Sequence, residues 1–107
     1  MAAKRTGISA DLIIHPGETL FDVLEERKMT QAELALMTGV SPAYINQIIK
    51  GKKNISMKFA FALERALGVP KSFWINLQTH YDMEKLEYEQ EHMPDEDIEY
   101  HQRKTAI

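Results

Sequence analysis

The chain has 107 residues, of which 44% are hydrophobic, so it is long enough for one small domain with a modest core and too short for several. It contains no cysteine, which excludes disulfides and thiolate metal sites. No apolar run approaches the roughly 20 residues of a membrane helix, and the basic N-terminus lacks the apolar segment of a signal peptide. We therefore expect a cytoplasmic protein without membrane contact.

The formal net charge of −3 is divided unevenly along the chain. Residues 1–71 contain ten Lys or Arg and seven Asp or Glu, a net charge of +3, whereas residues 72–107 contain three and nine, a net charge of −6. This asymmetry indicates two regions with different roles. Alternatively, the carboxylates of the second region only keep it in solution.

The first predicted elements are a flexible arm over residues 1–13 and a helix that starts at His15-Pro16. Proline is tolerated in the first turn of a helix, and this helix is expected to run to about Lys28. Its apolar residues recur at the three- and four-residue spacing of one buried face, and they are Leu20, Val23 and Leu24.

A second and a third helix follow, joined by a tight turn at a glycine. Thr30 and Glu33 have the spacing of a capping box, and Gly39 can end the second helix in the left-handed conformation. Ser41 caps the third helix and Pro42 takes its favoured first-turn position. The third helix is expected to bury Ile45, Ile48 and Ile49 and to expose Tyr44, Asn46, Gln47 and Lys50.

Two more helices complete the predicted fold. The fourth begins after Ser56 and ends at Leu67, and the fifth begins at Pro70 or Lys71 and continues as a charged helix through Tyr88. Residues 94–107 are expected to be disordered. Because no stretch alternates with a period of two, we predict an all-α fold: a five-helix domain over residues 14–82, followed by an acidic extension, helical and then disordered, over residues 83–107.

The second and third helices form a helix-turn-helix unit, which can lay its second helix in the major groove of double-stranded DNA. Gln47 is the strongest candidate reader, because an amide both donates and accepts and so matches the N6 and N7 edge of adenine. Tyr44 can contact a thymine methyl group or a phosphate, whereas Pro42 and Ala43 can only pack on methyl groups. The predicted base-reading residues are Pro42, Ala43, Tyr44 and Gln47.

Contacts with the DNA backbone are predicted on both sides of this helix. Gln31 stands at a helix N-terminus, where backbone N–H groups and the helix dipole favour an anion, and a lysine cluster follows the third helix. The predicted phosphate-binding residues are Gln31, Ser41, Asn46, Lys50, Lys52 and Lys53. Alternatively, the lysines form a solvated loop, Gln31 is an ordinary helix-start residue, and Tyr44 is partly buried.

Aromatic residues of the fifth helix offer a candidate dimer interface. DNA-binding domains of this size gain affinity by dimerising on half-sites about 34–36 Å apart. The candidate interface residues are Phe73, Trp74 and Tyr81. Aromatic residues at helical spacing also suit a core, and Phe73 or Trp74 is expected to pack on the first and fourth helices; the two roles are compatible.

The pattern of histidines and glycines gives no support to an enzyme. His80 and Glu84 lie one helical turn apart, but no third metal ligand stands at a fixed distance from them. The sequence has no H-E-x-x-H motif, no phosphate-binding glycine loop and no nucleophile elbow. We expect no catalytic activity, no cofactor and no bound metal.

Two sets of motifs carry a resemblance to a known family. Thr30-Gln31-Ala32-Glu33-Leu34-Ala35, Gly39-Val40-Ser41 and Ile45-Asn46-Gln47-Ile48 resemble the helix-turn-helix of the Cro/lambda-repressor type. The flanking segments Ile14-His15-Pro16-Gly17-Glu18, Gly51-Lys52-Lys53, Phe73-Trp74-Ile75-Asn76-Leu77-Gln78 and Tyr81-Asp82 resemble HigA-type antitoxins, the plasmid-maintenance antidote proteins. The resemblance covers about residues 14–82.

The resemblance implies a five-helix homodimer that represses its own operon on a palindromic operator and neutralises a RelE-like, ribosome-dependent ribonuclease toxin. The sequence departs from this pattern in two places. The acidic stretch Glu84–Glu99 is longer than a compact antitoxin needs, and Pro42 and Ala43 are apolar where relatives often carry polar readers. The alternatives are a stand-alone regulator and an interaction module whose acidic tail binds a partner.

Overall fold

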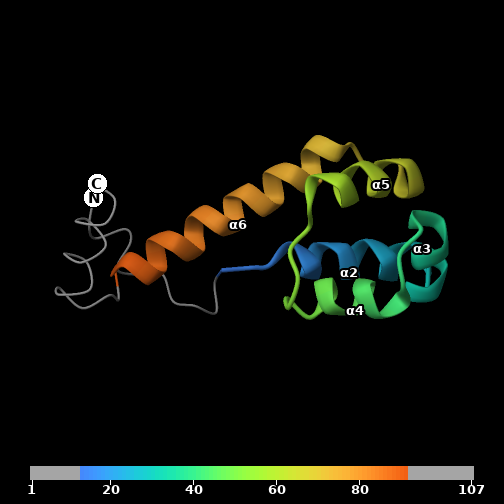
Figure 1. Ribbon diagram of the computed structural model, residues 1–107, viewed down its shortest axis with the longest axis horizontal. Coiled ribbons are helices and arrows are strands. Elements are labelled where there is room, and N and C mark those ends of the chain that lie inside the picture. Colours follow the sequence, from blue (N-terminus) through green and yellow to red (C-terminus); the bar gives the residue numbers. More distant parts are fainter. Residues whose placement is uncertain (1–12, 92–107) are drawn as a thin grey trace. The chain divides into compact units, whose positions relative to one another are not determined.

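The computed structural model describes residues 13–91, which form helices joined by short connections (Figure 1). Within this range there are five helices and no strand, and the helices are α2 (Pro16–Arg27), α3 (Gln31–Thr38), α4 (Pro42–Ile49), α5 (Met57–Leu67) and α6 (Lys71–Glu91). The prediction of an all-α fold with five helices is confirmed. The predicted disordered tail, and all of the predicted arm but its last residue, lie outside the described residues.

Residues Ile14–Tyr81 form one compact unit, which contains α2 to α5 and the first half of α6. The described part of the second unit comprises Ile13 and residues 82–91, the second half of α6. This second half carries five carboxylates and one lysine, and its apolar residues Met83 and Leu86 are more than half exposed.

Two helix ends differ slightly from those predicted. Helix α2 ends at Arg27, one residue earlier than expected, because Lys28 adopts the left-handed conformation (φ 55°) and its N–H closes the helix on the carbonyls of Leu24 and Glu25. Helix α6 runs to Glu91, three residues beyond the predicted Tyr88, through residues of good helix propensity (Glu89, Gln90, Glu91).

The core lies where α2, α3, α4 and α5 meet the first half of α6. Its largest fully buried residues come from all five helices, and they are Leu20, Leu34, Ile45, Ile48, Leu63 and Trp74. Burial of each such side chain contributes about 1.5–3 kcal/mol to folding. Val23 and Ile49, which the spacing assigned to the buried faces, are only partly buried and pack against the edge of the core.

The first turn of α2 packs directly on the end of α4. An added Cβ at Gly17 would lie only 1.9 Å from the carbonyl oxygen of Ile48, so the two backbones approach as closely as a glycine permits. At its other end, α2 is joined to α5 through Arg27, whose Nη1 donates to the carbonyl of Leu67 at 2.6 Å. These contacts join α4 to α2 and, through α2, to α5.

Candidate nucleic-acid interface

Short-range hydrogen bonds set the geometry of the helix-turn-helix formed by α3 and α4. The hydroxyl of Thr30 accepts from the N–H of Glu33 and the carboxylate of Glu33 accepts from the N–H of Thr30, which completes the capping box. Gly39 ends α3 with φ 79°, and its N–H donates to the carbonyl of Ala35. The hydroxyl of Ser41 then accepts from the N–H of Tyr44 and caps α4.

Helix α4 has one buried and one exposed face. Ile45 and Ile48 are completely buried, while Ala43 and Gln47 lie exposed one turn apart on the other face, next to Pro42. The side chain of Gln47 is therefore free to meet a base edge, and that of Ala43 to meet a methyl group. Three of the four predicted readers, Pro42, Ala43 and Gln47, are therefore exposed.

Tyr44, the fourth predicted reader, is turned toward α5. Its ring is half-buried and packs edge-on against Phe59, with ring centroids 5.4 Å apart, while Lys53 Nζ lies 5.9 Å from the ring centroid. Both contacts restrict the ring, which is therefore less available to a base edge than the exposed side chain of Gln47. Partial burial, the alternative considered for Tyr44, is what the structure shows.

Two of the predicted phosphate-binding residues are bonded to each other. The Nδ2 of Asn46 donates to the Oε1 of Gln31 at 3.3 Å, and both side chains are partly buried between α4 and α3. Gln31 is the first residue of α3. Asn46 therefore orients Gln31 and ties the two helices together, a role that its position in the sequence did not reveal.

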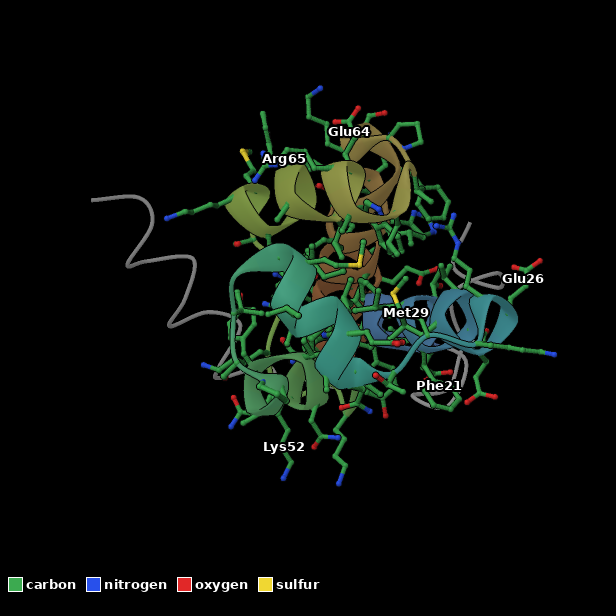
Figure 2. All side chains as sticks on the ribbon, turned by 90° about the vertical axis from the view of Figure 1, so that its right-hand side faces the viewer. Phe21, Glu26, Met29, Lys52, Glu64 and Arg65 are labelled. Carbon is green, nitrogen blue, oxygen red and sulfur yellow. The ribbon has the colours of Figure 1, made fainter. Side chains whose placement is uncertain are left out.

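The three predicted phosphate-binding lysines surround the turn that ends α4. The N–H groups of Lys52 and Lys53 both donate to the carbonyl of Gln47, at 2.8 and 3.2 Å, and Gly51 supplies the required positive φ of 78°. All three lysine side chains are exposed. Figure 2 shows Lys52 on the side that carries α4, opposite Glu64 and Arg65 of α5. The structure thus places three exposed lysines on the turn that is bonded to the backbone of Gln47, the residue predicted to read a base.

Two cations of α5 were not among the predicted phosphate-binding residues. Lys58 and Arg65 line a groove of about 270 Å³ together with Gly39 and Tyr44. Their spacing of seven residues on one helix was the available signal, since such residues share a face.

The predicted dimer residues separate into different environments. Phe73 is 41% exposed and Tyr81 is partly exposed, whereas Trp74 has no exposed surface. Trp74 therefore belongs to the core of each copy, and a direct contact between it and a partner chain is excluded in this conformation. The helical period places Phe73 and Trp74 on adjacent faces, and only the packing decides which face is buried.

Among residues 13–91 there is no group of three or more His, Asp or Glu side chains able to hold a metal ion. In the same range no helix combines the length and the apolar character that are needed to span a bilayer.

A family model described as helix-turn-helix matches residues 20–74, about half of the chain. The chain belongs to the helix-turn-helix family. Virulence-associated protein I of Dichelobacter nodosus is 34% identical to this helix-turn-helix protein over 79 residues, which are 73% of each chain. The residues matched by the family model include α3, α4 and the lysines that follow α4, on which the predicted interface depends.

Solved structures extend the comparison. Antitoxin GraA is 35% identical with a TM-score of 0.66, over 74% of this chain and 84% of that chain. The antitoxin HigA of Pseudomonas aeruginosa, solved with the higBA promoter, is 36% identical with a TM-score of 0.65, over 68% and 80%. The resemblance to HigA-type antitoxins of the Cro/lambda-repressor type is confirmed.

Proposed function

We propose that this helix-turn-helix protein is a sequence-specific repressor that acts as the antitoxin of a type II toxin-antitoxin pair. The observation that carries the proposal is the outer face of α4, where Ala43 and Gln47 are exposed and lysines follow directly. The amide offers base-specific hydrogen bonds, and the lysines bind phosphates whatever the sequence. The HigA antitoxin solved with its promoter supports the same role here. Such a repressor acts in the cytoplasm on a palindromic operator.

Replacing Gln47 by alanine is expected to weaken binding to the operator upstream of its own gene by about 1–3 kcal/mol, because a bidentate base contact is lost. The dependence of affinity on salt should stay unchanged, since no phosphate contact is removed. In contrast, Lys52→Gln should weaken binding to all sequences and lower the slope of log K against log salt by about 0.9. Fluorescence anisotropy with operator and scrambled duplexes at several salt concentrations measures both effects.

Matched controls are available on the same chain. Gln90→Ala removes an exposed amide from α6, and Lys28→Gln removes an exposed cation from the end of α2. Both should bind the operator like the wild type. Absence of wild-type binding at low salt would contradict the DNA-binding role, and an unchanged operator preference in Gln47→Ala would remove Gln47 as a reader.

The repressor is proposed to act as a homodimer whose interface includes the exposed aromatic surface of α6. Phe73 and Tyr81 are partly exposed in the single chain, and two copies would present two α4 helices to half-sites about 34–36 Å apart. Phe73→Asp is expected to shift the protein toward the monomer in sedimentation and to weaken binding to the full palindrome. A wild-type protein that binds the palindrome as a monomer would contradict this interface.

The neutralisation of a RelE-like ribonuclease toxin is the second part of the proposal. The second half of α6 has a net charge of −4, and its apolar residues Met83 and Leu86 are exposed, which suits a basic partner. If a short basic open reading frame lies next to the gene, its product should co-purify with this protein. Deletion of residues 83–107 should abolish co-purification and spare operator binding. Equal capture by the deleted form would place the toxin site elsewhere, and a gene without such a neighbour would favour a stand-alone regulator.

A further inference from the structure

The N-cap of α2 differs in chemistry from the other side-chain caps of the domain. Helices α3, α4 and α5 are capped by the hydroxyls of Thr30, Ser41 and Ser56, among the residues preferred at this position. Helix α2 is capped by His15, whose Nδ1 accepts from the N–H of Gly17 at 2.9 Å. Capping uses only one of the two ring nitrogens, so the other nitrogen of His15 can make a second contact.

The second nitrogen of His15 reaches the loop that follows α4. Because Nδ1 accepts a hydrogen bond, the ring proton is on Nε2, which donates to the Oδ1 of Asn54 at 3.3 Å. The side chain is buried, and it packs edge-on against Tyr81 of α6 with ring centroids 4.8 Å apart. The ring also covers Gly51, where an added Cβ would lie 3.7 Å from its Cγ. The imidazole of His15 thus contacts three parts of the domain: the first turn of α2, helix α6, and both ends of the Gly51–Asn54 loop.

This loop carries the two lysines whose N–H groups are bonded to the carbonyl of Gln47. Lys52 and Lys53 are exposed, while the backbone at the two ends of their loop is contacted by a buried side chain from another part of the chain. A cation that is held in place binds a phosphate with a smaller loss of conformational freedom than a cation on a mobile loop.

We propose that His15 is a positioning residue for DNA binding, which through Asn54 holds Lys52 and Lys53 in register with the DNA backbone. This inference rests on the proposed function, because the phosphates are those of the operator. Its effect on DNA is indirect, since the imidazole is buried and bonded to protein groups on both nitrogens. Gln47 meets this loop only through its backbone carbonyl. Its side-chain amide has no part in the link, so the sequence preference should be independent of the link.

Two variants break the link and leave the cap of α2 in place. Asn54→Ala removes the acceptor, and His15→Asn retains a preferred capping side chain that is too short to reach residue 54. Each is expected to lower operator affinity about 2- to 10-fold, the effect of one hydrogen bond, and to reduce the salt slope. The double variant should lose no more than His15→Asn alone, because that substitution already removes the bond to Asn54. Asn76→Ala, which removes an exposed amide from α6, is the matched control.

A second measurement is independent of DNA. The amide protons of Lys52 and Lys53 should exchange faster with solvent in both variants than in the wild type, with the amides inside the helices unchanged. If His15 had a merely structural role, His15→Asn would show the salt slope and the amide exchange of the wild type, and either result would overturn the inference. Operator binding by the wild-type protein would still support the proposed function in that case. A wild-type protein that binds no operator would overturn both.

Discussion

Replacement of Gly17 by alanine is expected to destabilise the domain by about 3 kcal/mol, although alanine is the better helix former by about 1 kcal/mol. Gly17 lies in the first turn of α2, and a Cβ there would meet the carbonyl oxygen of Ile48 at 1.9 Å, its carbonyl carbon at 2.8 Å and the Cα of Ile49 at 3.0 Å. All three atoms are backbone, so no side chain can rotate away. Helix α2 must move off α4 instead, and urea unfolding monitored by circular dichroism measures the loss.

Gly68→Ala provides the control for this prediction. Gly68 ends α5 with φ 76°, and an added Cβ there has no neighbour within 4 Å. Its substitution should cost only the strain of a left-handed alanine, about 1–2 kcal/mol. Equal stability of the wild type and Gly17→Ala would show that the backbones of α2 and α4 are farther apart than described.

Truncation of Trp74 is expected to have the largest effect on stability of any side-chain substitution. Its indole is the largest fully buried side chain, and Trp74→Ala should cost about 3–5 kcal/mol, a large part of the stability of a small domain. Trp74→Phe should cost less, about 1–2 kcal/mol, because the indole Nε1 is buried without a hydrogen-bond partner in the described structure. Thermal and urea unfolding of the two variants measure the difference.

The neighbouring Phe73 is the matched control, because it is an aromatic residue on the same helix with 41% of its surface exposed. Phe73→Ala should cost at most about 1 kcal/mol in the monomer. If Trp74→Phe were as destabilising as Trp74→Ala, the loss of buried volume would not explain the effect of either substitution. The indole N–H would then have a hydrogen-bond partner that the structure does not describe.

The helix boundaries could be predicted from the sequence because their causes are local. The hydroxyls of Thr30, Ser41 and Ser56 each accept a hydrogen bond from an N–H three residues later, and Gly39 ends its helix with a bond four residues back. Such contacts depend on residue type and short spacing, which are visible in the sequence. The exposed positions of Ala43 and Gln47 followed in the same way from the burial of Ile45 and Ile48.

The sequence predicted the arrangement of the candidate interface less completely than it predicted the helices. Several side chains of the interface contact residues that are far away in the sequence. The pairing of Asn46 with Gln31, the packing of Tyr44 on Phe59 and the bond between His15 and Asn54 join residues 15, 15 and 39 positions apart. Helical spacing shows which residues share a face but not which partner that face will meet. The sequence therefore predicted which residues could form the interface without showing which of them were already bonded to protein groups.

The sequence alone determined the five helices, the buried and exposed faces of the helix after Ser41 and the cluster of lysines that follows it, because these depend on caps, periodicity and residue type within a few positions. Only the tertiary structure decided that Trp74 is buried and Phe73 is not, that Gly17 must lack a side chain, and that His15 reaches Asn54. Each of these depends on the close approach of segments far apart in the chain, and the space available there is set by packing.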